Sequence, residues 1–121
     1  MTLTIAKRFR FEAHHRLPWH DGKCARDHGH SYLLEVAVRG PVRGDNGAPD
    51  SGMVIDFATL SEPVTQLVDE LLDHHSLNAV HANPTAEHIV EWLVATLRPV
   101  LPGLCRVRLW ETDTAYAEWS S

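Results

Sequence analysis

The hydrophobic pattern of the chain changes its period twice, and this order restricts the folds that it can adopt. Residues 2–15 and 28–39 alternate between apolar and polar side chains, which predicts two strands. Two stretches with helical spacing follow, and alternation returns at residues 104–110 and, more weakly, at 114–119. Two strands, two helices and two strands predict an α+β domain in which helices cover one face of an antiparallel sheet.

The helical stretches are expected at residues 57–72 and from Thr85 onward. The first has a single apolar stripe, and Pro63 suits it only in the first turn of its regular part, with Ser61 as the cap. The second has a good N-cap in Thr85. Residues 40–51 are rich in Gly, Pro, Asp and Asn, which predicts a flexible hairpin connection.

Composition narrows the class of protein. A chain of 121 residues with 44% hydrophobic residues suits one small domain, which oligomerisation would help to stabilise. The net charge of -5 argues against nucleic-acid binding, which normally needs a basic face. No signal peptide and no stretch of about 20 apolar residues is expected from the pattern. Cys24 and Cys105 could form one disulfide, but a single pair is no disulfide framework, so both are expected to be reduced thiols in a cytoplasmic protein.

Histidine is the compositional outlier, with nine copies. His28 and His30 occupy alternate positions of a predicted strand, so both imidazoles point to one face. That pair alone is a weak signal, but His15 continues the apolar face of the other strand and offers a third imidazole. Three histidines that leave one position open are the ligand set of a catalytic zinc. The remaining unpaired histidines are expected to be solvated or structural, namely His14, His20, His75, His81 and His88.

Other positions carry groups that suit acid–base chemistry or binding. Cys24 lies in a polar loop with basic residues nearby, which favour a thiolate, so it is a candidate base or nucleophile. Asp73 precedes His74 and could orient its imidazole, although a histidine that meets the last helix carbonyls is the simpler explanation. Glu111 ends a predicted strand, and in a pocket it would pair with the N–H edge of a donor-rich ring.

A different metal site fits part of the sequence. Gly22, His28, His30 and Glu35 have the spacing of a cupin metal strand, in which Glu35 would be a fourth ligand. Glu35 falls on the opposite face of the strand from the two histidines unless a bulge intervenes. A cupin is an all-β jelly roll, which leaves no place for two amphipathic helices.

Six short motifs make the chain similar to the 6-pyruvoyl-tetrahydropterin synthase and 6-carboxytetrahydropterin synthase (QueD) family. They are, in order, Phe11-Glu12-Ala13-His14-His15-Arg16-Leu17, Cys24 with His28-Gly29-His30, Gly52-Met53-Val54-Ile55-Asp56-Phe57, Asp73-His74 with Leu77-Asn78, Pro84-Thr85-Ala86-Glu87, and Glu111-Thr112. The resemblance implies the tunnelling fold (T-fold), a four-stranded antiparallel sheet with two helices between the second and third strands. Subunits of this fold join edge to edge into a barrel, usually a homohexamer of two trimers, with active sites between subunits.

The resemblance also implies a role for each candidate group. It implies that zinc acidifies hydroxyl protons of the substrate and is held by three histidines, His15, His28 and His30. It implies that Cys24 is the general base. Asp73 and His74 would form a proton relay that works with this base and is supplied by a neighbouring subunit.

Four residues are expected to bind the substrate. The resemblance implies that Glu111 anchors a pterin through its 2-amino and N3 edge and that Thr85 helps to line the same pocket. By position, Lys23 and Arg26 are the candidates for contact with a triphosphate.

The implied substrate is 7,8-dihydroneopterin triphosphate, from which both branches of the family eliminate triphosphate. One branch forms 6-pyruvoyl-tetrahydropterin. The other also loses acetaldehyde and yields 6-carboxy-5,6,7,8-tetrahydropterin, the precursor of 7-deazapurines such as queuosine. The short spacing between Cys24 and His28 resembles that of this second, QueD branch, which implies the lyase activity that forms the carboxylated product. The alternatives are the pyruvoyl-forming synthase, a side-chain-cleaving enzyme that feeds folate synthesis, and a catalytically silent pterin-binding homologue.

Overall fold

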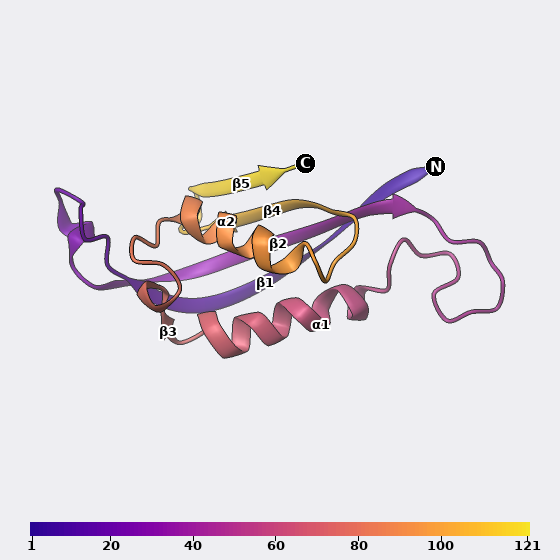
Figure 1. The fold of residues 1–121 in the computed structure, drawn as a ribbon, viewed down its shortest axis with the longest axis horizontal. Coiled ribbons are helices and arrows are strands. Elements are labelled where there is room, and N and C mark those ends of the chain that lie inside the picture. The colour runs from indigo at the N-terminus through magenta and orange to yellow at the C-terminus, as the bar shows by residue number, and fades with distance from the viewer.

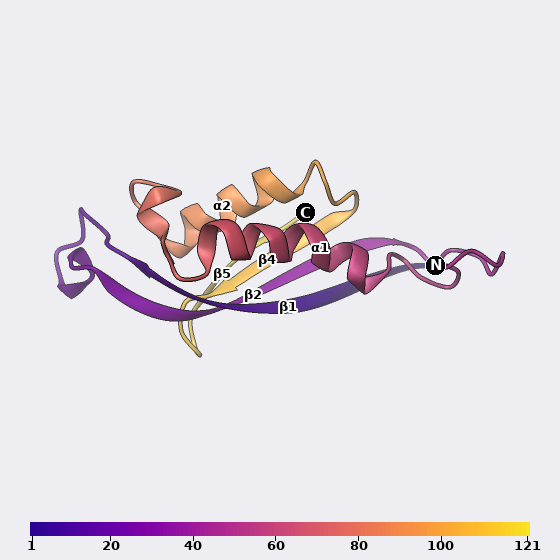
Figure 2. The same ribbon diagram turned by 90° about the horizontal axis from the view of Figure 1, so that it is seen from below.

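The computed structural model describes residues 1–121 and confirms the predicted α+β fold class. Its strands are β1 (Thr2–His15), β2 (His28–Pro41), β3 (His75–Ser76), β4 (Leu104–Trp110) and β5 (Tyr116–Ser120), and its helices are α1 (Phe57–Leu67) and α2 (Ala86–Leu97). Both helices cover the same face of the sheet (Figure 1 and Figure 2). Neither helix has the length and the apolar character that a membrane span requires.

The sheet has the strand order β3-β1-β2-β4-β5. The four long strands are antiparallel neighbours, as predicted. The sheet has one strand more than expected, because β3 pairs in parallel with β1 at Ala13 and His14. A strand of two residues is too short to show alternation, so no periodicity could have indicated it.

The hairpin of β1 and β2 runs along the length of the molecule (Figure 2). Each strand has 14 residues, and the pairing extends from Thr2 opposite Pro41 to His15 opposite His28. In the same register Ala13 lies opposite His30. The ladder therefore brings histidines from two separate segments to one end of the hairpin.

One apolar core of 21 buried residues fills the space between the sheet and the helices. The sheet contributes alternate residues of β1 and β2, and Phe11 stacks on Tyr32 with 5.0 Å between ring centroids. The helices contribute buried stripes, which are Leu60, Val64 and Leu67 from α1 and Ile89, Val90, Leu93, Val94 and Leu97 from α2. Burial of each such side chain contributes about 1.5–3 kcal/mol, which holds the helices against one face of the sheet.

The start of α1 corrects one prediction. Asp56, not Ser61, is its N-cap, because the Asp56 carboxylate accepts a hydrogen bond from the Ala58 N–H at 2.8 Å. Pro63 therefore lies inside the helix and not in its first turn. The helix tolerates this proline because the Thr59 carbonyl, which loses its usual N–H partner, belongs to an exposed residue that water can reach.

The position of Glu35 excludes the cupin alternative, because it lies on the polar sheet face away from the helices. Glu35 points to this face, where its carboxylate accepts hydrogen bonds from Arg8 at 3.1 Å and from Arg106 at 2.6 Å. Burial alone would raise the pKa of Glu35, but the two guanidinium groups outweigh burial and lower the pKa. Glu35 is thus occupied by two arginines on the face opposite His28 and His30.

Candidate functional site

Three imidazoles meet where β1 ends and β2 begins. His15 is the last residue of β1, and His28 and His30 lie at the start of β2. One ring nitrogen from each lies within 4.8 Å of the others, and the rings meet edge to face. His15 is fully buried and the other two are partly buried. This three-histidine cluster is positioned to bind a metal ion.

Backbone carbonyls fix the protons of two of these rings. The Nδ1 atom of His15 lies 3.0 Å from the Pro84 carbonyl, and Nδ1 of His28 lies 2.7 Å from the Arg26 carbonyl. A carbonyl oxygen can only accept, so each Nδ1 carries the proton and each Nε2 presents a lone pair. A hydrogen bond of this kind commonly supports a metal-bound histidine.

The other ring nitrogens are arranged as metal donors. The Nε2 atoms of His15 and His28 lie 3.0 Å apart with no hydrogen to share, and Nε2 of His30 is buried without a hydrogen bond. Facing lone pairs and an unpaired buried nitrogen are destabilising unless a cation lies among them. The donor set therefore fits a divalent metal that accepts three imidazoles, such as zinc.

Burial keeps two of these imidazoles neutral. It lowers the pKa of His15 and of His30 from the ordinary value of 6.5. This effect exceeds the opposing influence of the Pro84 carbonyl on His15 and of the Glu111 carboxylate on both rings. Neutral imidazole is the form that binds a metal. The folded chain thus favours the metal-binding protonation state of His15 and His30.

Glu111 connects the cluster to an open pocket. Its Oε1 atom lies 3.4 Å from Nε2 of His30. It also lines a pocket of about 450 Å³, together with residues from β5 and the first turn of α2. Thr85 lies directly before that turn as the predicted N-cap, and its hydroxyl accepts a hydrogen bond from the His88 N–H. A ligand ring in this pocket would meet the Glu111 carboxylate close to the histidine cluster.

Cys24 lies in the loop between β1 and β2, on one turn of 3₁₀ helix. It is a free and half-buried thiol, and Lys23 and Arg26 beside it are exposed. The end of this loop is tied to β1 by His14, whose Nδ1 lies 2.9 Å from the Asp27 carboxylate. The loop thus presents one thiol and two cations next to the strand that carries His28.

Asp73 and His74 follow a π-helical turn, Val68–Leu72, that extends α1. Oδ1 of Asp73 accepts a hydrogen bond from the Glu12 N–H at 2.9 Å, and Oδ2 lies 3.0 Å from Nδ1 of His74. The bond from Glu12, and then that from His74, lowers the pKa of Asp73. His74 has a φ of 59°, an unfavourable value for a residue with a side chain, and 79% of its side chain is exposed. The carboxylate therefore orients an imidazole that faces solvent.

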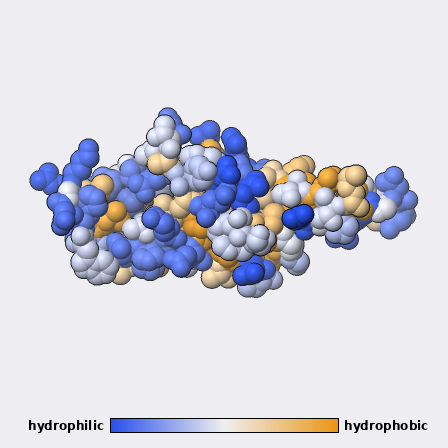
Figure 3. All heavy atoms as spheres, turned by 90° about the horizontal axis from the view of Figure 1, so that it is seen from above, coloured by the Kyte–Doolittle hydropathy of each residue, from blue (hydrophilic) through white to orange (hydrophobic).

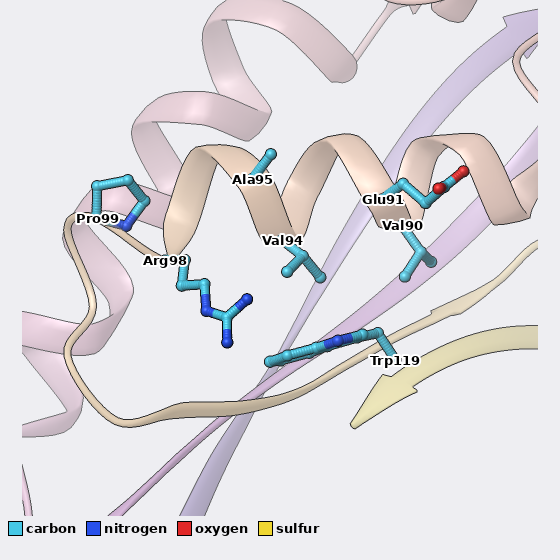
Figure 4. A pocket seen from close by; sticks show the side chains of 7 residues that line it. All are labelled: Val90, Glu91, Val94, Ala95, Arg98, Pro99 and Trp119. Carbon is cyan, nitrogen blue, oxygen red and sulfur yellow. The ribbon is translucent and has the colours of Figure 1, made fainter. Parts of the chain in front are cut away.

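A separate pocket of about 540 Å³ lies between α2 and β5 (Figure 4). Val90 and Val94 point toward Trp119, and the Arg98 guanidinium lies over the Trp119 ring at 5.4 Å from its centroid. The pocket is mostly apolar, and its one cation is engaged with the indole. Without several polar groups that converge on a ligand, this pocket is a weaker candidate for an active site than the pocket beside Glu111.

Sequence reasoning did not identify the groups that orient the histidine rings. These are the carbonyls of Pro84 and Arg26 and the hydroxyl of Tyr32, which lies 3.4 Å from Nδ1 of His15. Every residue has a carbonyl, so only the fold shows which carbonyls face the cluster. For Tyr32 a signal existed, because it shares the predicted face of His30.

Comparisons with known proteins identify the family of the chain. Residues 4–121 match the family model described as 6-pyruvoyl tetrahydropterin synthase. A 6-carboxy-5,6,7,8-tetrahydropterin synthase of Synechocystis sp. is 42% identical over 120 residues, which cover 97% of this chain and 92% of that protein. A dihydroneopterin monophosphate aldolase of Pyrococcus furiosus is 41% identical over 87 residues, or 69% of each protein.

A solved structure shows the same fold. The 6-pyruvoyl tetrahydropterin synthase of Caenorhabditis elegans is 27% identical and matches with a TM-score of 0.83, covering 100% of this chain and 96% of that one. The family match and the structural match together span nearly every residue, including all six motifs. The chain therefore belongs to the 6-pyruvoyl tetrahydropterin synthase family and has its tunnelling fold.

Proposed function

We propose that the chain is a zinc-dependent lyase that converts 7,8-dihydroneopterin triphosphate into 6-carboxy-5,6,7,8-tetrahydropterin, with release of triphosphate and acetaldehyde. The observation that carries this proposal is the three-histidine cluster, with the Glu111 carboxylate 3.4 Å from His30 at the edge of a pocket. The name of the Synechocystis relative supports the carboxylated product. The proposed product would feed 7-deazapurine synthesis, such as that of queuosine, and the two free thiols are consistent with a reducing cytoplasm.

His15, His28 and His30 are the proposed zinc ligands. Bound zinc supplies Lewis acidity, which lowers the pKa of hydroxyl groups on the substrate side chain. The chain's own contribution is to keep the imidazoles of His15 and His30 neutral by burial and to orient the rings. The Pro84 and Arg26 carbonyls hold two of the rings with Nε2 toward the centre of the cluster.

Cys24 is the proposed general base, and Asp73 with His74 is its proposed relay. A thiolate can accept a proton from a substrate hydroxyl, and an imidazole held by a carboxylate can pass a proton on. The exposed ring of His74 faces solvent in its own chain. We therefore assign it to the active site of a neighbouring subunit, where it would meet the Cys24 loop.

Glu111 is the proposed anchor of the pterin ring. A carboxylate accepts two parallel hydrogen bonds, which matches the adjacent 2-amino and N3 donors of a pterin. Thr85 is proposed to line the same pocket, since the two residues that follow it do so. Lys23 and Arg26 are exposed and free to contact the triphosphate.

We infer that the chain acts as a homohexamer of two trimers. β5 is an edge strand, and β3 covers only Ala13 and His14 of β1, so most of β1 is a second free edge. Free edges favour pairing with another chain. Leu3, Val42 and Phe57 expose between 41% and 51% of their surface, and hydrophobic atoms gather toward the end of the molecule where the N-terminus lies (Figure 3). Both features suit subunit contacts.

A second candidate activity is cleavage of the pterin side chain without formation of the carboxylated product. The Pyrococcus furiosus relative, named an aldolase of dihydroneopterin monophosphate, favours this alternative because its identity of 41% is close to that of the synthase. The pyruvoyl-forming reaction is supported by the C. elegans structure. These reactions leave different pterins, so their products discriminate between them.

The test is to incubate the zinc-loaded chain with 7,8-dihydroneopterin triphosphate, and in parallel with the monophosphate, and to identify the products by mass spectrometry. The proposal predicts 6-carboxy-5,6,7,8-tetrahydropterin and acetaldehyde from the triphosphate. Pyruvoyl-tetrahydropterin, or cleavage of the monophosphate alone, would replace the proposal with one of the alternatives. Tight pterin binding without turnover would indicate a silent homologue. His28→Ala serves as the metal-free control.

A further inference from the structure

A stacked pair of histidines lies beside the turn at Pro84, whose carbonyl binds His15 of the three-histidine cluster. The ring centroids of His81 and His88 are 4.1 Å apart, and the ring planes differ by 28°. Both residues are only partly exposed, and both bind the backbone of Asn83. Neither belongs to the proposed ligands, base or substrate contacts.

The pair holds both polar backbone groups of Asn83. The Asn83 N–H donates to Nδ1 of His81 at 2.9 Å, and Nδ1 of His88 donates to the Asn83 carbonyl at 2.8 Å. The backbone partners fix the protons, because an N–H can only donate and a carbonyl can only accept. Nδ1 of His81 is therefore bare, and Nδ1 of His88 is protonated.

Asn83 begins a tight turn centred on Pro84. The Thr85 N–H donates to the Asn83 carbonyl at 2.9 Å. A hydrogen bond from residue i+2 to residue i defines a γ-turn, and proline, whose φ is negative, permits only the inverse form. Thr85 is fixed in turn as the N-cap of α2. Both neighbours of Pro84 are thus held, and its carbonyl accepts the bond from Nδ1 of His15 at 3.0 Å.

We propose that His81 and His88 are positioning residues for the three-histidine site. They hold Asn83, which directs the Pro84 carbonyl, and this carbonyl keeps His15 in the tautomer that turns Nε2 toward the cluster. This inference rests on the proposed metal site. A stacked pair with only a structural role would stabilise the fold without changing the affinity for a metal.

The test is a titration of the chain with Co²⁺ in the presence of a competing chelator, followed by the visible absorption of the bound ion. His81→Ala and His88→Ala are expected to weaken Co²⁺ binding by about tenfold, the lower end of the effect known for groups that support metal ligands. His81→Asn and His88→Asn are expected to restore most of the affinity. An asparagine amide places an acceptor or a donor near the position of Nδ1.

Two variants separate positioning from stability. Ile89→Val removes a methylene group from a fully buried side chain of α2 and leaves the turn intact, so it should lower the melting temperature but not the Co²⁺ affinity. His88→Phe keeps an aromatic ring against His81 but has no donor for the Asn83 carbonyl. It is expected to weaken Co²⁺ binding as His88→Ala does, and it tests the proposal if the alanine variants do not fold.

The outcomes test the positioning role separately from the proposed metal site. If the wild-type chain does not bind Co²⁺, the proposal of a metal site is wrong. If the wild-type chain binds and His81→Ala, His88→Ala and His88→Phe bind equally well, only the positioning role is overturned. A loss of affinity in Ile89→Val as large as that in the alanine variants would also overturn it, since stability alone would then explain the effect.

Discussion

The two groups of residues that we assign to chemistry differ in how firmly the chain holds them. In the three-histidine cluster, His15 is fully buried, and His15 and His28 are each fixed by a backbone carbonyl. In the proposed relay, the side chain of His74 is 79% exposed, the residue has a positive φ, and its Nδ1 atom pairs with the Asp73 carboxylate. One chain therefore brings together all three histidines of the cluster, whereas the imidazole of the proposed relay is oriented toward solvent.

This difference suggests why a small chain of this kind would assemble. The strain at His74 is held in place by the bonds of Asp73 and His74 to the Glu12 backbone. Strained residues that the surrounding structure fixes are often functional. An exposed imidazole oriented in this way is suited to a neighbouring subunit, and the free strand edges supply the means of contact.

The largest effect is expected at the buried cluster. His28→Ala removes one of the three proposed ligands, so bound zinc should fall to background, and turnover should fall with it. This loss should exceed the loss of about 10- to 100-fold that follows removal of a group that only supports a ligand. Zinc content measured by mass spectrometry after dialysis against a chelator checks this. His20→Ala, an exposed histidine of the adjoining loop, is the matched control and should keep its zinc. Unchanged zinc in His28→Ala would remove this residue from the ligand set.

The next effect separates chemistry from metal binding. Cys24→Ala should keep the fold and the zinc but lose about 10²- to 10⁴-fold in turnover, the usual contribution of a general base. Cys105→Ala is the control, because that thiol donates only to the Ala37 carbonyl within the sheet. Steady-state rates with equal zinc loading make the comparison. Full activity in Cys24→Ala would contradict its role as base.

A mixing experiment tests the shared site directly. Cys24→Ala and His74→Ala chains are each expected to be nearly inactive, whereas assemblies refolded from an equal mixture should recover part of the activity. Some sites then combine an intact Cys24 with an intact His74 from another chain. Assemblies of His74→Ala alone, treated in the same way, are the control. If activity does not return, the relay does not act across an interface.

The smallest expected effect is a dependence of stability on pH. In the folded chain, burial holds the pKa of His15 and His30 below 6.5, the ordinary value expected in the unfolded chain. The unfolded state therefore binds protons first, so the two neutral histidines stabilise the fold above pH 6.5, and this contribution disappears as the pH falls through their lowered values.

Urea titrations of the metal-free chain at successive pH values measure this contribution. The free energy of unfolding should fall by up to about 1.4 kcal/mol per pH unit for each histidine. Zinc should move the loss to lower pH, because it binds the neutral imidazoles of the folded state. A free energy of unfolding that stays constant through this range, with and without zinc, would show that burial does not perturb the two histidines.

Local sequence was sufficient to predict the face or cap position of a residue wherever that position depends only on its neighbours along a strand or helix. Alternation placed His15 on the face of Phe11 and His30 on the face of Tyr32, and antiparallel pairing then made these faces one surface. The cap at Thr85 was predicted correctly for the same reason, since a threonine hydroxyl reaches its own helix.

Features that depend on distant partners could not be predicted in this way. Ser61 and Asp56 are both residue types that cap helices, and in the structure the helix begins at Phe57 with Asp56 as its cap. The hydrogen bonds of His81 and His88 with the Asn83 backbone depend on how the chain folds back before α2. Lone histidines are usually solvated, so that pattern carried no signal of a stacked pair.

The most direct test of the account is the coordination of zinc in the purified chain, measured by X-ray absorption at the zinc edge. Binding by His15, His28 and His30 with an open position predicts three nitrogen neighbours at about 2.0–2.1 Å, a further light-atom neighbour, and no sulfur. A sulfur neighbour at about 2.3 Å would contradict this result. It would place the Cys24 thiolate in the coordination shell, where it could not serve as the general base.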